Sequence, residues 1–277
     1  MRCIRAMIQT MRKFFIITAL ILAICGSAFA QKNVNKESIN MFMFQATYAF
    51  QIPALDTRDL FGVNHTIGPS VIFKTSSNWL FTGNVNFIVG RRVKGDRTDI
   101  LGEGITTPAG EIIGGGGLFC ELATYERGIH YQVEVGKIFP IWPNPNSGIF
   151  VQLGLGYLEN RIRIDFQQEV YNTPYQVYKD YAYGYDRKRG GFALHGEAGY
   201  ILFSNSNLLN FSLSFEVTYA RTRDQRKYDF RVFYDENGQP QPVGYTNHKG
   251  YNDLYFGIRA SWMIPVYKRQ PESYYYH

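Results

Sequence analysis

The chain has 277 residues, 16% of them aromatic, with 29 lysines and arginines against 23 aspartates and glutamates and a formal net charge of +6. Residues 1–30 hold four of the basic residues and no acid, so the remainder carries 25 basic and 23 acidic residues. That near-neutral balance argues against nucleic acid as a partner. The aromatic content excludes intrinsic disorder. A bundle of membrane helices is excluded because no apolar run of about 20 residues follows residue 30.

Residues 1–30 have the pattern of a cleaved export signal. Two basic residues precede the apolar run 14–25, and the cleavage pattern Ala28-Phe29-Ala30 follows it. Translation starts at either Met1 or Met11 in this interpretation. The alternative is an uncleaved anchor helix, which we favour less because the run is short for a membrane span.

Eight later segments alternate between apolar and polar residues with a period of two, as strands do when one face is apolar and the other polar. In chain order they are residues 39–51, 65–74, 79–90, 128–138, 148–160, 190–202, 208–221 and 252–266. Long connections (52–64, 91–127, 161–189 and 222–251) alternate with short ones (75–78, 140–147 and 204–207). This arrangement predicts an all-β, eight-stranded, antiparallel up-and-down transmembrane β-barrel.

We assign the predicted barrel to residues 31–267 and a short periplasmic tail to residues 268–277. An even strand number places both termini on the periplasmic side, with the long loops outside. The alternative is a soluble β-sandwich or lipocalin-like barrel, which would keep its apolar face inside and its polar face in water. We favour that alternative less, because the apolar face here is large and aromatic and the long loops all fall on one side.

The last predicted strand contains the pattern Tyr255-x-Gly257-x-x-Ala260-x-Trp262, and the stretch 184–195 reads GYDRKRGGFALH. With these features the chain resembles Gram-negative outer-membrane β-barrel proteins, in particular small barrels of the Bacteroidetes type whose function is not established. The resemblance implies an outer-membrane location, and it implies that the barrel assembly machinery reads those four residues. Here a tyrosine replaces the commoner polar first residue, and residues 263–277 trail beyond the pattern. The resemblance implies no biochemical activity.

Charged and polar residues of inward parity form the candidate site within the predicted barrel. This lumen polar network consists of Glu134, Glu197, Glu216, Arg259, Gln152 and Asn84. Counted from the periplasmic rim, Glu216 and Arg259 lie level on neighbouring strands, so we predict an ion pair between them. Side chains fill a barrel of this size, so we interpret the network as a structural polar plug. A narrow solute or proton pathway is the alternative.

Basic residues cluster where the predicted strands leave the outer leaflet. This outer-rim collar consists of Arg91, Arg92, Arg161, Arg163, Lys188, Arg189, Arg221 and Arg223. Lipid phosphates of that leaflet offer charge-assisted contacts to such residues. The alternative is that they are ordinary solvated loop charges interleaved with acids.

Catalysis needs a nucleophile and a base within reach of each other. His195 and Glu197 share the inward face but lack an adjacent serine on it, so we predict no catalytic residues. We also predict no cofactor and no metal site, because His130 and His195 fit structural hydrogen bonds better than metal ligation. Cys120, the one cysteine beyond the predicted signal, can form neither an internal disulfide nor a cysteine-rich zinc site.

These patterns predict a structural or interaction protein without a wide, porin-like pore. It is either an accessory subunit of an outer-membrane complex or a surface binding barrel. A narrow channel and a lipid-modifying enzyme are the alternatives. The expected partners are outer-membrane lipids and lipopolysaccharide, the barrel assembly machinery during biogenesis, and a protein partner in the complex.

Overall fold

The computed structural model describes residues 37–94, 107, 109, 111–141, 143–166, 172–174, 182–204, 209–226 and 250–266. The predicted export signal (1–30) and periplasmic tail (268–277) lie outside the described residues. Within the described part of the chain, no helix is long and apolar enough to cross a bilayer.

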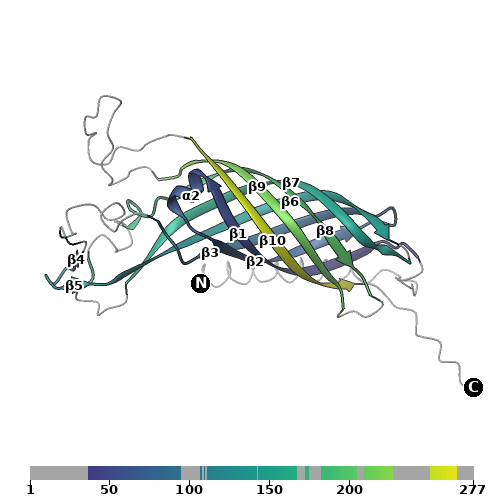
Figure 1. Ribbon diagram of the computed structural model, residues 1–277, viewed down its shortest axis with the longest axis horizontal. Coiled ribbons are helices and arrows are strands. Elements are labelled where there is room, and N and C mark those ends of the chain that lie inside the picture. Colours follow the sequence, from purple (N-terminus) through teal and green to yellow (C-terminus); the bar gives the residue numbers. More distant parts are fainter. Residues whose placement is uncertain are drawn as a thin grey trace, which may run out of the picture. The chain divides into compact units, whose positions relative to one another are not determined.

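Eight strands close into one barrel in the order β1-β10-β9-β8-β7-β6-β3-β2, and all neighbours are antiparallel (Figure 1). The barrel strands are β1 (Met41–Leu55), β2 (Asn64–Lys74), β3 (Trp79–Gly90), β6 (Leu122–Ile141), β7 (Asn144–Phe166), β8 (Arg189–Leu202), β9 (Phe211–Asp224) and β10 (Gly250–Val266). The other elements are the helix α2 (Asp56–Leu60) and a two-stranded sheet of β4 (Ile112–Ile113) and β5 (Phe119–Cys120). The predicted eight-stranded barrel is confirmed.

Two features of the long-loop end differ from the prediction. Strands β6 and β7 run further than the alternation of residues indicated, and they stay paired from Gly128↔Asn160 up to Leu122↔Phe166. Here the paired residues include Arg161 and Arg163 on an exposed face, so apolar alternation no longer marks the strand. The helix α2 and the small sheet of β4 and β5 were not predicted, because elements of five and two residues are too short to show a period.

The outer surface of the barrel is apolar and aromatic. Val133 and Leu153, in the middle of β6 and β7, are 67% and 69% exposed. Tyr131, Tyr157 and the neighbouring Phe192 follow one another across β6, β7 and β8, and all are exposed. An apolar surface that continues around every strand is stable against hydrocarbon and unfavourable in water. Closure also pairs the backbone groups of the barrel strands, as a lipid environment requires.

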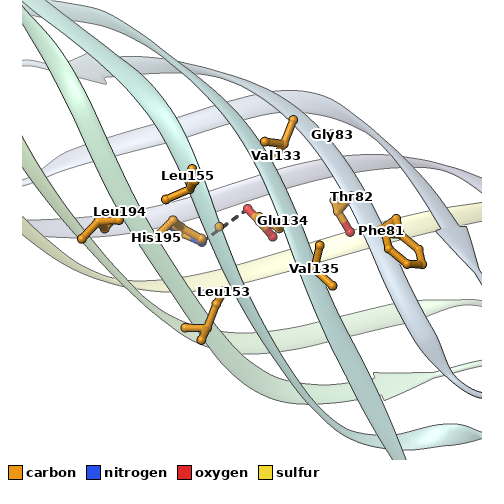
Figure 2. Close-up of a pocket in the computed structure, with 11 residues that line it drawn as sticks. Phe81, Thr82, Gly83, Val133, Glu134, Val135, Leu153, Leu155, Leu194 and His195 are labelled. Carbon is orange, nitrogen blue, oxygen red and sulfur yellow. Dashed lines mark ion pairs between the residues drawn. The ribbon is translucent and has the colours of Figure 1, made fainter.

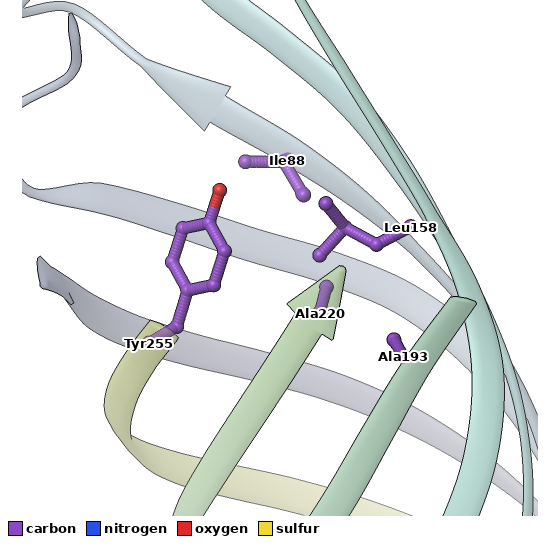
Figure 3. Close-up of a cluster of buried hydrophobic side chains, with 5 residues drawn as sticks. All are labelled: Ile88, Leu158, Ala193, Ala220 and Tyr255. Carbon is purple, nitrogen blue, oxygen red and sulfur yellow. The ribbon is translucent and has the colours of Figure 1, made fainter. Parts of the chain in front are cut away.

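The interior is built of layers. At the short-turn end most buried side chains are apolar, namely Ile39, Met41, Met43, Ile72, Leu80, Ile138, Phe150, Ile201, Phe203 and Met263. The buried Lys74 lies at the same end and donates a hydrogen bond to Asn146 at 2.7 Å. The middle layer is polar and contains the predicted lumen polar network. Above it lies a second apolar cluster, formed by Ile88, Leu158, Ala193, Ala220 and Tyr255 (Figure 3). The polar centre of the barrel therefore lies between a largely apolar layer at the short-turn end and an apolar cluster above it.

A further polar layer and the helix α2 cover the upper apolar cluster. Asn64 donates hydrogen bonds to both carboxylate oxygens of Glu126, at 3.0 and 3.1 Å. Asp253 accepts from Thr57 of α2 at 2.5 Å and from Thr222 at 2.6 Å. Phe61, the first residue after α2, belongs to a buried cluster with Leu60 and Ile162. These contacts anchor α2 on the inner face of β10.

Candidate functional site

The centre of the lumen is organised around Arg259 of β10. Its Nε lies 2.6 Å from Glu216 Oε2, and its Nη1 lies 3.4 Å from Glu197 Oε2. All three residues are buried. The predicted pairing of Glu216 with Arg259 is therefore present. The two residues are not level, because Gly257 and not Arg259 pairs with Glu216 in the ladder, so the side chains meet on the diagonal.

Inward-facing glycines give these long side chains their room. A Cβ at position 257 would come within 2.9 Å of Glu216 Cγ. A Cβ at position 154 would come within 2.5 Å of Glu134 Cγ and 2.6 Å of the Val133 carbonyl oxygen. The glycines of β7 and β10 thus specify where the carboxylates of the neighbouring strands lie.

Glu134, His195 and Glu197 form a second group beside Arg259. Glu134 Oε1 lies 3.6 Å and Glu197 Oε2 lies 3.8 Å from His195 Nε2. Glu134 and His195 belong to β6 and β8, which are separated by β7, and they approach each other across Gly154 (Figure 2). One ligand-type atom from each of the three residues lies within 4.8 Å of the others.

Polar neighbours hold most of the remaining atoms of the network. Asn84 donates to Glu134 Oε1 at 2.7 Å, so it lies in the predicted network. Gln152 accepts from Thr82 at 2.9 Å. Gln51 donates to Glu216 Oε1 at 2.6 Å. This residue was not among the predicted members of the network, although the alternation of β1 places it on the inward face.

The two inward histidines have different partners. His130 Nδ1 lies 2.6 Å from the amide nitrogen of Gln132. His195 Nδ1 lies 2.8 Å from the hydroxyl of Thr218. Their rings are edge to face with centroids 6.1 Å apart. The expected structural hydrogen bonds are thus present on one nitrogen of each ring, whereas His195 Nε2 has no hydrogen-bond partner among the described residues.

The outer-rim collar is less uniform than its sequence suggests. Its exposed members are Arg91, Arg92, Arg161, Arg163, Arg221 and Arg223. Arg163 is paired with Asp165 at 2.7 Å. Lys188 is paired with Glu159 at 2.8 Å. Arg189 is buried, with its guanidinium 3.5 Å from the centre of the Tyr251 ring. Some of the collar charge is therefore neutralised within the protein.

An additional rim cation, which lay outside the predicted collar, is Arg226. It donates to the carboxylate of Asp186 from Nε at 2.9 Å, and its guanidinium also lies 4.2 Å from the centre of the Tyr183 ring. The hydrogen bond to Asp186 is the main cause of a raised pKa of Arg226. This contact links the segment before β8 to the residues after β9.

The four residues of the predicted assembly pattern lie on β10, the strand that closes the barrel against β1. Ala260 and Trp262 face outward, whereas Tyr255 and Gly257 face inward. Tyr255 belongs to the upper apolar cluster, and its hydroxyl accepts a hydrogen bond from Asn160 at 2.9 Å. The pattern is thus also part of the interior packing.

No model of a known protein family and no curated protein matches the chain. Among solved structures, Neisserial surface protein A is similar at 10% identity and a TM-score of 0.41, covering 80% of this chain and 96% of that one. Ail, the attachment invasion locus protein of Yersinia pestis, crystallised with the heparin analogue sucrose octasulfate, is 11% identical with a TM-score of 0.38, covering 82% and 99%. The outer membrane protein OprG from Pseudomonas aeruginosa is 12% identical with a TM-score of 0.36, covering 84% and 99%.

Proposed function

We propose that the chain is an outer-membrane β-barrel with a structural or interaction role and no wide pore. It acts as an accessory subunit of an outer-membrane complex or as a surface binding barrel. The observation that carries this proposal is the layered interior, in which the polar centre lies between a largely apolar layer at the short-turn end, which also contains the buried Lys74, and the upper apolar cluster. Water and ions enter apolar, close-packed layers unfavourably.

The central charges support the same function. Arg259 is held by Glu216 at 2.6 Å and lies 3.4 Å from Glu197, so its charge is compensated inside the protein. A conducting lumen would need polar groups free to exchange partners with passing water or solute. The proposal assigns no catalytic step to these residues.

Lipid contacts follow from the outer surface. We propose that the apolar outer surface of the barrel contacts acyl chains. We also propose that exposed members of the collar contact lipopolysaccharide phosphates. Arg91, Arg92 and Arg221 are exposed and suit that contact, whereas Arg189 is buried and does not. The assembly pattern on β10 would be read by the barrel assembly machinery before the strand closes.

Planar-bilayer recording on the purified chain tests the closed lumen. We expect no stepwise conductance above the baseline of the lipid alone. A steady conductance at neutral pH would contradict the proposal and favour a narrow channel. A porin with a known open channel, recorded in the same lipid, serves as the positive control.

Purification in mild detergent with mass spectrometry of co-purifying proteins separates the two interaction roles. An accessory subunit is expected to leave the membrane in stoichiometric complex, whereas a free-standing binding barrel leaves it alone. Mass spectrometry of lipid A from a deletion strain addresses the remaining alternative. Altered acyl chains there would contradict a non-enzymatic role.

A further inference from the structure

We propose that Glu134, His195 and Glu197 bind one divalent transition-metal ion inside the barrel, with Zn²⁺ as the best match. The distances from His195 Nε2 to the two carboxylates are 3.6 and 3.8 Å, which are too long for hydrogen bonds. Two ligands of one tetrahedral Zn²⁺ lie about 3.4 Å apart, given metal–ligand bonds of about 2.1 Å. The gap between these side chains therefore has the size that a bound ion needs.

One ligand atom of His195 and one of Glu134 are available to an ion, whereas Glu197 Oε2 also lies 3.4 Å from Arg259 Nη1. His195 Nε2 and Glu134 Oε2 are buried and have no hydrogen-bond partner among the described residues. His195 Nδ1 lies 2.8 Å from the Thr218 hydroxyl. When Nδ1 carries the proton and donates it to Thr218, Nε2 presents a lone pair toward the two carboxylates. In metal sites, the ring nitrogen of histidine that does not bind the metal usually donates a hydrogen bond of this kind.

Hydrogen-bond donors also orient the two carboxylates. Asn84 donates to Glu134 Oε1 at 2.7 Å, and Ser214 donates to Glu197 Oε1 at 2.5 Å. A small cavity of about 10 Å³ is lined by both carboxylates and has room for about one water ligand at the open position. Three protein ligands and one water make a common coordination set for zinc.

The charge of the centre favours a cation. Glu134, Glu197 and Glu216 are buried, and Arg259 forms ion pairs with Glu197 and Glu216. When all three carboxylates are ionised and the imidazoles are neutral, the negative charges exceed the single charge of Arg259 by two, and buried charges are costly unless they are paired or bound to metal. A divalent ion would balance them. The imidazole ligand favours zinc and its neighbours in the first transition row over Ca²⁺ or Mg²⁺.

Equilibrium dialysis of the purified full chain in detergent against buffered Zn²⁺, followed by elemental analysis, tests the site. We expect about one zinc ion per chain for the wild type. His195→Gln and Glu134→Gln should lose that ion. Thr218→Val removes only the hydrogen bond behind the imidazole, and should weaken zinc affinity by about tenfold or more.

The matched controls keep the site intact. Glu126→Gln changes an equally buried carboxylate of the same strand, β6, and His65→Gln removes a histidine that stacks on Tyr48 outside the lumen. Both should bind zinc as the wild type does. Zinc bound equally by every variant, or lost only with His65, would show adventitious surface binding and overturn the proposal. Absence of zinc from the wild type would also overturn it.

A wild-type measurement keeps the test independent of how the variants fold. Co²⁺ bound in place of zinc should show the visible absorption of a four-coordinate site with nitrogen and oxygen ligands, and added Zn²⁺ should displace it. X-ray absorption of the zinc form should show one imidazole among light-atom ligands. A six-coordinate, water-like Co²⁺ spectrum, or no imidazole scattering, would contradict the assignment.

Discussion

Glu134 and His195 lie on strands that are not neighbours, yet Glu134 Oε1 is 3.6 Å from His195 Nε2. The intervening strand β7 contributes Gly154 at this level, and Gly154 pairs with Glu134 on one side and with His195 on the other. Because glycine carries no side chain, the two polar side chains meet over the backbone of β7. A single glycine thus determines that the carboxylate and the imidazole form one site.

The substitution Gly154→Ala should separate the pair. The new Cβ would lie 2.5 Å from Glu134 Cγ and 2.6 Å from the Val133 carbonyl oxygen, so both must move. Overpacking of this kind costs about 1–3 kcal/mol. Urea unfolding of the barrel in lipid vesicles, followed by tryptophan fluorescence, measures that loss.

The control for this prediction is Gly83→Ala on β3. Gly83 faces outward, and a Cβ there would meet no atom within 4 Å. We expect its unfolding midpoint to match that of the wild type. Equal unfolding midpoints for Gly154→Ala and Gly83→Ala would show that the lumen accommodates the added methyl group. That result would contradict close packing around Gly154.

Removal of the central cation should destabilise the barrel strongly. Arg259→Ala leaves Glu216 and Glu197 buried without the guanidinium that holds them at 2.6 and 3.4 Å. Breaking a buried ion pair from one side costs about 3–5 kcal/mol. The heat-induced gel shift, which reports barrel unfolding, should move to lower temperature.

The same change at an exposed rim residue and a compensating double variant complete the test. Arg221→Ala, on the outer face of β9, should leave the gel shift in place. Arg259→Met combined with Glu216→Gln removes charge from both sides and should recover part of the stability. An unchanged gel shift in Arg259→Ala would contradict a structural role for this pair.

The strand pattern was predictable because lipid and lumen impose opposite polarity on alternate residues. That rule placed Glu134, Glu197, Glu216 and Arg259 inside correctly. It could not give strand shear, so it did not show that Glu134 and His195 pair with the same residue of β7. The inward glycines of β7 could have indicated this contact, since large polar side chains on the two neighbouring strands need the space that a glycine leaves.

The apolar layers were harder to foresee for a related reason. Ile88 and Leu158 lie on the inward parity, where an isolated apolar residue breaks the alternation and carries little weight. The register of β3, β6 and β7 brings these two residues together, and the closed barrel places Tyr255 of β10 against them. The sequence therefore predicted a polar lumen, whereas the interior alternates between polar and apolar layers.

The hydroxyl of Tyr255 should contribute modestly and its ring strongly. Tyr255→Phe removes the hydrogen bond from Asn160, at 2.9 Å, and should cost about 1 kcal/mol. Tyr255→Ala also removes the ring from the upper apolar cluster and should cost about 3–5 kcal/mol. Urea unfolding in vesicles gives both values. A larger loss for the phenylalanine variant than for alanine would contradict the packing role.

Helix α2 should loosen when its buried anchor is removed. Thr57 donates to Asp253 Oδ1 at 2.5 Å, and the backbone N–H of Asn252 donates to Asp56 at 2.7 Å. Thr57→Val keeps the shape of the side chain but loses the first contact, while Asp253 keeps its bond to Thr222 at 2.6 Å. Exchange of backbone amides in 56–63 should therefore accelerate by about tenfold to a hundredfold, because a hydrogen bond to a charged group contributes about 1.5–3 kcal/mol. Arg58→Ala, an exposed change in the same helix, should leave that exchange rate unaltered. Equal rates for both variants would show that α2 is held by Leu60 and Phe61 alone, and not by the polar layer beneath it.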